Sequence, residues 1–326
     1  MPADLALIAD IREPGDLPGQ EGVCSDYQPR YPLGSTSANW RTTAARGGVV
    51  KHFENKVAAI TGAGSGIGSG LALELARRHC HLALCDINEA GLQETVEHAR
   101  AAGVDVTAHV VDVADRSAVY DWADHVATAH GKVNLVFNNA GVALSSSVQG
   151  TDYEDFEWLM NINFWGVVYG TKAFLPHIKA TGDGHIVNIS SVLGLAAIPG
   201  QCTYNAAKFA VRGFTECLRE ELDIMKCGVS ATSVHPGGIK TGIARAARNR
   251  SSIGDLGFDH ETIAPKVEKN FITSPEKAAS TIIRAVEKNK RRVLVGPDAY
   301  FYDGLARLLP SGYQRIAIAF VKNALK

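Results

Sequence analysis

A glycine-rich stretch near residue 60 constrains the fold of this chain more than any other segment. An apolar run at 56–61 precedes it, four glycines fall within the seven positions 62–68, and apolar residues then recur at helical spacing over 67–79. A strand, a glycine turn and a helix in this order form a cradle for a pyrophosphate. The glycines let phosphates approach the backbone, and the helix N-terminus presents unpaired N–H groups. We therefore expect a dinucleotide site at this turn.

An acidic residue supports this interpretation, although the glycine spacing G-x-x-x-G-x-G departs from the strict G-x-G-x-x-G pattern. Asp86 ends the second apolar run, about 20 residues after the turn, where a carboxylate can accept hydrogen bonds from both hydroxyls of an adenosine ribose. The alternative is that Asp86 is only a strand-end turn residue. The preceding glycine turn favours the ribose.

Strands and helices alternate from Lys56 onward, and this alternation predicts an α/β fold. We expect a doubly wound parallel sheet of about seven strands with helices on both faces and a crevice at the carboxyl ends of the strands. The predicted strands are 56–61, 81–86, 104–111, 133–138, 185–190, 228–234 and 292–296. The predicted helices are 67–79, 89–102, 116–130, 154–179, 202–226 and 275–289. Residues 236–272 carry few such signals, which is typical of a functional lid or of disorder.

Composition excludes several classes of function. The net charge of −1 gives no support to a nucleic-acid partner. The six cysteines contain no C-x-x-C pair, which favours a reducing, cytoplasmic location, and no secretory signal opens the chain. None of the eleven histidines forms H-x-x-x-H or H-E-x-x-H, so we predict no metal site. No apolar run approaches the ~20 residues of a membrane span.

A tyrosine and a lysine four residues apart carry the sharpest chemical signal. Tyr204 and Lys208 would share one face of a helix. A free phenol has a pKa near ~10, and an ammonium at ~4 Å could lower it by up to roughly three units. Tyr204 could then transfer protons near neutral pH. The alternative is a surface pair that arises by chance.

The motifs together resemble the short, single-domain branch of the short-chain dehydrogenase/reductase family, from about Phe53 to Gly296. The resemblance rests on T-G-A-G-S-G-I-G at 61–68, Asp86, Asp112-Val113, N-N-A-G at 138–141, Asn163 in N-F-W-G, Ser191 in I-V-N-I-S-S, Y-N-A-A-K at 204–208 and H-P-G-G-I-K-T at 235–241. Motif order and spacing agree throughout, including the serine thirteen positions before the tyrosine. The joint match is far more specific than any single motif.

The resemblance implies hydride transfer between a nicotinamide cofactor and a secondary alcohol or ketone. Tyr204 would exchange the substrate proton, and Lys208 would lower the phenol pKa and hold the nicotinamide ribose. Ser191 would hydrogen-bond the substrate oxygen. Asn163 would hold a water molecule that links Lys208 to solvent. The neighbouring Ser190 would brace the strand end.

The resemblance also implies a set of cofactor-binding residues. These are Gly62, Ser65, Gly66, Ile67, Gly68, Asp86, Ile87, Asp112, Val113, Asn139, Ala140, Gly141, Tyr204, Lys208, Pro236, Gly237, Ile239 and Thr241. Thr241 would grip the nicotinamide carboxamide. The carboxylate of Asp86 would repel a 2′-phosphate and Ile87 supplies no cation, so we predict NAD(H) in preference to NADP(H).

The substrate and the assembly are less constrained. The apolar stretch 192–201 favours a hydrophobic substrate. Three arginines farther along the chain could face a carboxylate or CoA, or they could form a solvated surface; they are Arg245, Arg248 and Arg250. Two other functions on the same fold remain, a lyase or epimerase and a non-catalytic dinucleotide sensor. The resemblance suggests a homodimer or homotetramer through the helices at 154–179 and 202–226.

The chain therefore divides into three predicted parts. Residues 1–50, rich in Pro, Gly and Ser, form a disordered or loosely attached extension, or the native start lies near Val49–Lys51. Residues 51–297 form the Rossmann-type catalytic domain. Residues 298–326 form an amphipathic helical tail with basic residues, for which we expect packing on its own domain or another subunit, or weak contact with a membrane surface.

Overall fold

The computed structural model describes residues 50, 52–259 and 261–324 of the 326-residue chain. The predicted N-terminal extension therefore lies outside the described residues, apart from Val50 at its end.

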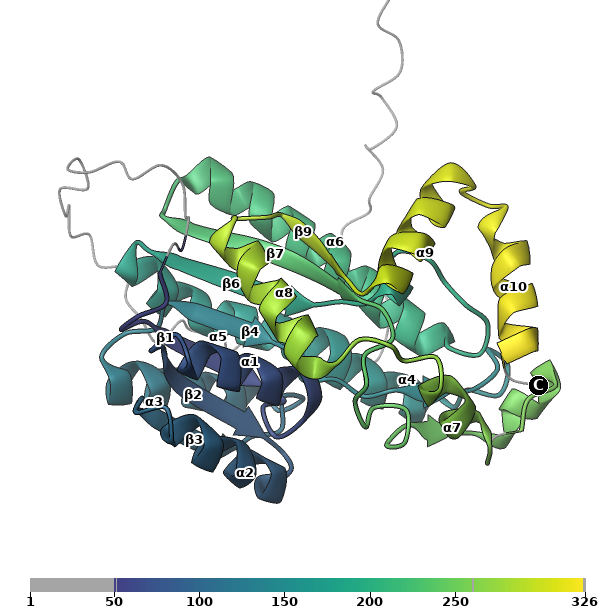
Figure 1. Ribbon diagram of the computed structural model, residues 1–326, viewed down its shortest axis with the longest axis horizontal. Helices are drawn as coiled ribbons and strands as arrows, with labels where there is room; N and C mark the ends of the chain where they lie inside the picture. Colours follow the sequence, from purple (N-terminus) through teal and green to yellow (C-terminus); the bar gives the residue numbers. More distant parts are fainter. Residues whose placement is uncertain (1–49, 51, 260, 325–326) are drawn as a thin grey trace, which may run out of the picture. The chain divides into compact units, whose positions relative to one another are not determined.

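The core is a seven-stranded parallel sheet in the order β3-β2-β1-β4-β6-β7-β9 (Figure 1). Its strands are β1 (Val57–Thr61), β2 (His81–Asp86), β3 (Val106–Val110), β4 (Leu135–Asn138), β6 (Gly184–Ile189), β7 (Val229–Pro236) and β9 (Arg292–Val295). The central strands are buried on both faces, as continuous apolar runs require. The strand order reverses between β1 and β4, and this reversal opens a crevice at their carboxyl ends.

Helices cover both faces of the sheet, so the predicted fold class is confirmed (Figure 1). One face packs against α1 (Gly66–Ala76), α2 (Glu89–Arg100) and α8 (Pro275–Glu287). The other packs against α3 (Arg116–His130), α5 (Gly166–Thr181) and α6 (Cys202–Met225). The N-terminus of α8 forms as its sequence predicts, since the Ser274 hydroxyl accepts a hydrogen bond from the Lys277 N–H and Pro275 is the first helical residue.

The helix predicted at 154–179 is interrupted. It consists of α4 (Tyr153–Met160), a π-helical turn over Asn161–Trp165, and α5. A π turn inserts an extra residue and redirects the side chains that follow it, and such turns occur frequently at functional sites. This turn contains the predicted site residue Asn163.

The segment 236–272 is more ordered than its sequence suggests. It contains β8 (Arg248–Asn249), a 3₁₀ turn over Ser251–Leu256, and α7 (Ile263–Glu268). The strand β8 pairs in parallel with β5 (Leu144–Ser145), which follows the end of β4. This second, two-stranded sheet ties the predicted lid to the main domain.

The predicted tail consists of two helices, α9 (Pro297–Leu308) and α10 (Tyr313–Ala324), because the intervening segment contains Pro310 and Gly312. The side chains of Tyr313, Ala317 and Val321, spaced four apart, are buried against the domain. No helix among the described residues is long and apolar enough to cross a membrane.

Candidate active site

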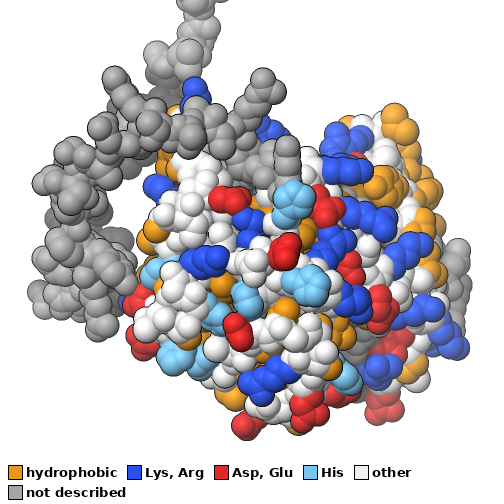
Figure 2. All heavy atoms as spheres, turned by 60° about the vertical axis from the view of Figure 1, so that its left-hand side comes forward, with side chains coloured by type: hydrophobic (Ala, Val, Ile, Leu, Met, Phe, Trp, Pro, Cys, Tyr) orange, Lys and Arg blue, Asp and Glu red, His pale blue; other side chains and the backbone are white. Residues whose placement is uncertain are grey.

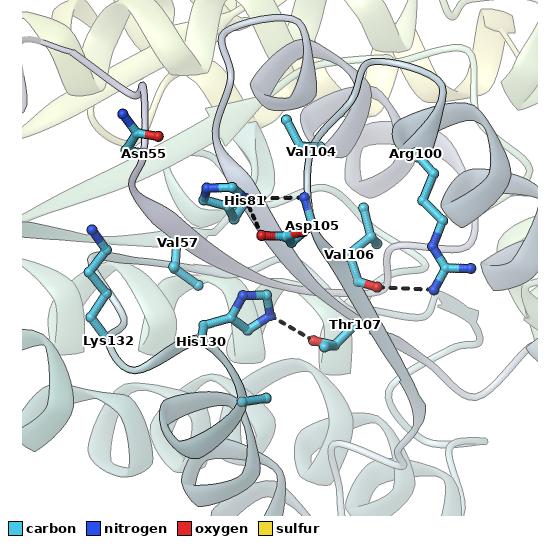
Figure 3. Close-up of a pocket in the computed structure, with 11 residues that line it drawn as sticks. Asn55, Val57, His81, Arg100, Val104, Asp105, Val106, Thr107, His130 and Lys132 are labelled. Atoms are coloured by element: carbon cyan, nitrogen blue, oxygen red, sulfur yellow. Dashed lines mark hydrogen bonds and ion pairs between the residues drawn. The ribbon is translucent and has the colours of Figure 1, made fainter.

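Two cavities lie at opposite ends of the strands. The first, of about 790 Å³, lies at the carboxyl ends and contains Gly66, Tyr204 and Lys208 in its wall. The second, of about 650 Å³, lies at the amino ends of β1, β2 and β3 (Figure 3). The two histidines in the second cavity are already engaged. His81 Nδ1 lies 3.2 Å from Asp105 Oδ2, and His130 Nε2 lies 3.0 Å from the Thr107 hydroxyl. The first cavity is therefore the candidate active site.

Histidine side chains are visible over one face of the molecule (Figure 2). The rings of His109 and His125 pack edge to face with their centroids 4.5 Å apart, and burial, followed by the charge of His125, lowers the pKa of His109. Among the described residues, no group of three His, Cys, Asp or Glu side chains is arranged to hold a metal ion. The absence of a metal site stays a prediction.

The glycine turn is shaped as a phosphate cradle. Gly62 and Gly66 have φ angles of +64° and +54°, which favour glycine. A Cβ at Gly68 would lie 2.0 Å from the Gly62 carbonyl oxygen, so this position brings helix and strand together. Within the described chain, the N-cap Ser65 side chain makes no capping hydrogen bond, and the first turn of α1 holds no acidic residue. The N–H groups of that turn can therefore bind an anion.

Asp86 lies at the end of β2 with its carboxylate against the glycine turn. Its Oδ2 accepts a hydrogen bond from Gly64 N (2.8 Å), and its Oδ1 accepts one from Asn88 N (2.9 Å). A carboxylate has about four acceptor positions, so two remain for ribose hydroxyls. Together with the cradle, this arrangement fits the adenosine end of a dinucleotide.

The two asparagines after β4 brace the strand ends. The side-chain nitrogen of Asn139 donates to the carbonyl oxygens of Thr61 (2.9 Å) and Gly62 (3.1 Å). Asn138 is buried and donates to Asn188 Oδ1 across the sheet (2.8 Å). These bonds hold the floor of the cavity, and Ala140 follows with only a methyl group in its wall.

Tyr204, Ser191 and Lys208 meet at the centre of the cavity. The Ser191 and Tyr204 side chains are hydrogen-bonded, which lowers the phenol pKa. Lys208 is 3 % exposed, its ammonium donates to the Ile189 carbonyl oxygen (3.0 Å), and it lies 5.6 Å from the centroid of the Tyr204 ring. The phenol, hydroxyl and ammonium therefore converge from α6 and the end of β6.

The expected fall in the Tyr204 pKa is wrong for this structure. Burial raises the pKa of Tyr204 above its ordinary value, and the hydrogen bond with Ser191 offsets this only in part. Burial also lowers the pKa of Lys208 to about 8. The helical spacing brings the ammonium over the ring, 5.6 Å from its centroid, and desolvation of the buried phenol outweighs its hydrogen bond with Ser191.

Asn163 is buried behind the cavity. Its amide oxygen accepts a hydrogen bond from Val142 N and its amide nitrogen donates to Val142 O, each at 2.8 Å. A Cβ at Gly141 would lie 3.2 Å from Asn163 Oδ1 and 3.6 Å from Lys208 Nζ, so these residues are neighbours. Ser190, as expected, braces the site, since its hydroxyl donates to the Lys208 carbonyl oxygen (2.7 Å).

The structure gathers the predicted site residues into one place. All of the predicted cofactor residues except Gly68 line the cavity, and so does Ser191. Gly68 lies against the Gly62 backbone, and Asn163 lies behind the wall.

Comparison with known proteins gives the same result. Residues 56–252 match the family model for short chain dehydrogenases. The chain belongs to the short-chain dehydrogenase/reductase family.

The relatives are oxidoreductases. The chain is 51 % identical over 270 residues to the putative oxidoreductase SadH of Mycobacterium tuberculosis. The aligned region covers 82 % of this chain and 96 % of SadH. It is 30 % identical to human estradiol 17-beta-dehydrogenase 11, over 81 % of this chain and 82 % of that protein. A short-chain dehydrogenase/reductase from Burkholderia phymatum, solved in complex with NAD, superposes on this chain with a TM-score of 0.74 and 30 % sequence identity. The superposition covers 81 % of this chain and 96 % of the Burkholderia chain. This chain is therefore an oxidoreductase of the type that acts on CH–OH groups.

The far end of this dehydrogenase's cavity is apolar. Side chains from the segment after β6, from the lid and from the tail line it, namely Val192, Leu193, Ile198, Pro199, Ile253, Phe258, Ile263, Val267 and Val321. Ile253, Phe258, Ile263 and Val321 form one buried cluster. The tail thus completes this apolar wall.

The three lid arginines are all paired with acidic side chains of the protein. Arg245 Nη1 lies 2.9 Å from Glu268, and Arg248 and Arg250 both bind the buried Asp155 of α4, at 3.0 and 2.7 Å. The Arg248 guanidinium also stacks on the Trp158 ring at 3.6 Å. These ion pairs tie the lid arginines to Glu268 and to α4.

Sequence reasoning expected the tail to contribute to the substrate site but assigned no individual tail residue to the cavity wall. Asp298, Tyr302 and Val321 lie beyond the segment with recognisable motifs, yet all three line the cavity. A carboxylate directly after the last strand, at the same edge as Asp86 and Asp112, was the signal that could have identified Asp298.

Proposed function

We propose that this protein is an NAD(H)-dependent oxidoreductase that interconverts a hydrophobic secondary alcohol and its ketone. The observation that carries the proposal is the meeting of Tyr204, Ser191 and Lys208 in a cavity with a dinucleotide cradle at one end and an apolar wall at the other. The bound cofactor would supply or accept the hydride.

The protein's own residues would handle the proton and the oxygen. Tyr204 would donate a proton to the ketone oxygen, or accept the proton of the alcohol. Ser191 would donate a hydrogen bond to the same oxygen and stabilise its developing charge. Lys208 would bind the nicotinamide ribose, and Asn163 would hold a water molecule between Lys208 and solvent. The raised pKa of Tyr204 keeps the phenol protonated at neutral pH, the form that donates a proton in ketone reduction.

The preference for NAD(H) is supported by the end of β2. A 2′-phosphate would meet the carboxylate of Asp86, and the exposed side chain beside it, Ile87, carries no charge. Asp86→Ala is expected to narrow the preference by about tenfold or more in kcat/KM, because it removes both the ribose acceptor and the repulsion. If Asp86→Ala left the ratio of kcat/KM for NAD(H) to that for NADP(H) unchanged, or if the wild-type chain preferred NADP(H), the proposed preference for NAD(H) would be contradicted. The similar Burkholderia phymatum enzyme was solved with NAD.

The apolar substrate is supported by the cavity wall and by one relative, which is named for estradiol, a hydrophobic alcohol. The test is a panel of secondary alcohols and ketones of increasing apolar size, followed at the nicotinamide absorbance band. We expect kcat/KM to rise with apolar size until the substrate fills the part of the ~790 Å³ cavity that the dinucleotide leaves open. Turnover confined to small or carboxylated substrates would contradict the proposal.

Assembly and membrane contact stay proposals. Membership of the family suggests a homodimer or homotetramer that forms through α4, α5 and α6. We also propose that the chain divides into a catalytic domain at 51–297 and a tail at 298–326. The tail exposes Leu308 on α9 and Ile316 and Ile318 on α10, which would suit weak contact with a membrane surface at a cytoplasmic location. Liposome flotation with and without residues 305–326 tests this contact, and equal behaviour of both forms would exclude it.

A further inference from the structure

The two-stranded sheet presents polar side chains to the cavity. In β5, Ser145 lines the cavity, whereas Leu144 is buried in a core cluster. In β8, Asn249 lines the cavity, whereas Arg248 pairs with the buried carboxylate on α4. Successive side chains of a strand point to opposite faces, and Ser145 and Asn249 are partners in the register of the two strands. Their side chains therefore lie next to each other on the face that borders the cavity.

A glutamine at the start of α6 joins this pair. Gln201 is the N-cap residue of α6, lines the same cavity, and donates a hydrogen bond of 3.1 Å from Nε2 to Ser145 Oγ. The backbone fixes all three residues, because Ser146 forms a β-bridge with Gln201 and Arg250 N donates to Ser145 O (2.9 Å). Ser145, Gln201 and Asn249 thus form one group, which we call the polar cluster.

The polar cluster has hydrogen-bonding groups that the protein does not use. Within the described residues, the Asn249 side chain makes no hydrogen bond and the Gln201 amide oxygen accepts none. Both side chains are half-buried, and none of their unused amide atoms is enclosed within the protein. An amide offers two N–H donors and an oxygen with two lone pairs. The cluster therefore presents donors and acceptors to a molecule in the cavity.

Apolar side chains surround the polar cluster. Gly200 lies against the apolar wall, since a Cβ there would be 2.8 Å from Ile253 Cδ1. Ile198 and Pro199, which precede it, also line the cavity. A few polar groups placed in a mostly apolar wall orient a ligand and provide its specificity. The polar cluster is placed to do this at the substrate end.

The charges beside the polar cluster are neutralised. Arg248 and Arg250, the residues on either side of Asn249, both form ion pairs with Asp155. Carboxylates and phosphates are normally bound by charged guanidinium or ammonium groups. Amide and hydroxyl groups instead match an uncharged oxygen, such as that of a hydroxyl or carbonyl group.

The polar cluster also lies close to the proton-transferring residue. Gln201 and Tyr204 are three residues apart at the start of α6, which corresponds to about 4.5 Å along the helix axis. We propose that Ser145, Gln201 and Asn249 bind a second, uncharged oxygen of the substrate. The preferred substrate is then an apolar alcohol or ketone that carries a further hydroxyl or carbonyl group. This inference rests on the proposed function and names the substrate class of the same site.

The test uses pairs of ketones that share one carbon framework and differ by one oxygen function. One member is purely apolar, and the other carries a tertiary hydroxyl or an ester carbonyl, neither of which exchanges hydride, at a chosen distance from the ketone. Reduction by NADH is followed at the nicotinamide absorbance band. For the wild-type chain we expect kcat/KM to favour the oxygen-bearing member about tenfold at one separation, mainly through KM.

Two substitutions and a matched control assign this preference to the polar cluster. Asn249→Leu and Gln201→Leu replace an amide by an apolar side chain of similar size, and each should reduce the preference at least about threefold. Neither should lower kcat/KM for the purely apolar member. Gln149→Leu makes the same kind of change in the loop after β5, where Gln149 is exposed and lies outside the cavity wall, so it should leave the preference unchanged.

Three outcomes would overturn the inference. These are equal kcat/KM for both members at every separation in the wild-type chain, an unchanged preference in both leucine variants, and an equal loss for both members, which would show that the amides only maintain the structure. If Gln201→Leu does not fold, Asn249→Leu decides, because it leaves the hydrogen bond between Gln201 and Ser145 intact. Failure of the wild-type chain to turn over any ketone or secondary alcohol would refute the proposed function itself, which is a different outcome.

Discussion

The cofactor end and the substrate end of the cavity are built in different ways. The cofactor end consists of backbone turns and strand-end residues between β1 and β4, where the critical contacts join residues of neighbouring strands, such as Gly64 with Asp86. The substrate end joins segments far apart in the chain, with Ile198, Ile253 and Val321 in a single cluster. The cofactor end depends on glycines, whose lack of a side chain opens the backbone to a ligand, whereas the substrate end depends on the packing of apolar side chains. Substitutions at the two ends should therefore affect different steps.

The largest effect is expected where the two ends meet. Tyr204→Phe removes the phenol hydroxyl that is hydrogen-bonded to Ser191 and should lower kcat by about 10³-fold, the usual scale of general acid–base catalysis. The Kd of NADH should stay within about twofold, because the ring is kept. Steady-state kinetics and NADH fluorescence give the two values.

Tyr153→Phe is the control, because Tyr153 is 86 % exposed on α4. Equal activity of Tyr204→Phe and this control would exclude the tyrosine mechanism.

The pH dependence should differ between the two reaction directions. Oxidation needs the phenolate, and the pKa of Tyr204 is raised, so kcat/KM for the alcohol should rise about tenfold per pH unit from pH 6 toward pH 8. Reduction needs the phenol and should not rise over that range. It should then decline above about pH 8, where Lys208, with its pKa lowered to about 8, loses its charge. Initial rates in both directions at constant ionic strength measure this. An oxidation rate that is flat from pH 6 to 9 would contradict it.

A glycine substitution should affect the cofactor end alone. Gly66 has a φ of +54°, and an added Cβ would lie 2.8 Å from Thr241 Cγ2. Gly66→Ala should therefore raise the Kd of NADH by about tenfold or more, since the turn must shift away from the phosphates.

Gly213→Ala is the matched control, because an added Cβ there meets no described atom within 4 Å and the position is helical. A Kd for NADH that is the same in both variants would show that the turn tolerates a side chain and does not cradle phosphate.

The fold and the cofactor end were predictable because their determinants are local. The alternation of apolar runs and helical periods specifies a parallel sheet, and the glycines at 62–68 and Asp86 mark one edge of it. The spacing of Tyr204 and Lys208 likewise predicted that they share a face. It could not predict burial, which decides the direction of the Tyr204 pKa.

The substrate end was not predictable because its contacts span more than a hundred residues. Tyr313 accepts a hydrogen bond from Ala197 N at 3.1 Å across 116 residues, although this tail residue belongs to no recognisable motif. The π turn at 161–165 is also hidden, since nothing in its sequence marks it off from the continuous helix predicted at 154–179.

The smallest effect is expected from loosening the lid. Asp155 is 2 % exposed, and hydrogen bonds from Arg250 and then Arg248 hold its pKa below its usual range. Asp155→Asn removes the charge that both guanidiniums share and weakens the attachment of β8 to the domain. We expect KM for the substrate to rise about three- to fivefold, with kcat and the Kd of NADH nearly unchanged, because only the apolar wall shifts.

Asp223→Asn is the matched comparison. Asp223 also binds two arginines, Arg219 and Arg291, but it lies outside the cavity wall. If both variants change KM equally, the effect is a general loss of stability. If Asp155→Asn changes the Kd of NADH as much as KM, the two ends of the cavity are mechanically coupled, and the independence inferred from their construction is wrong.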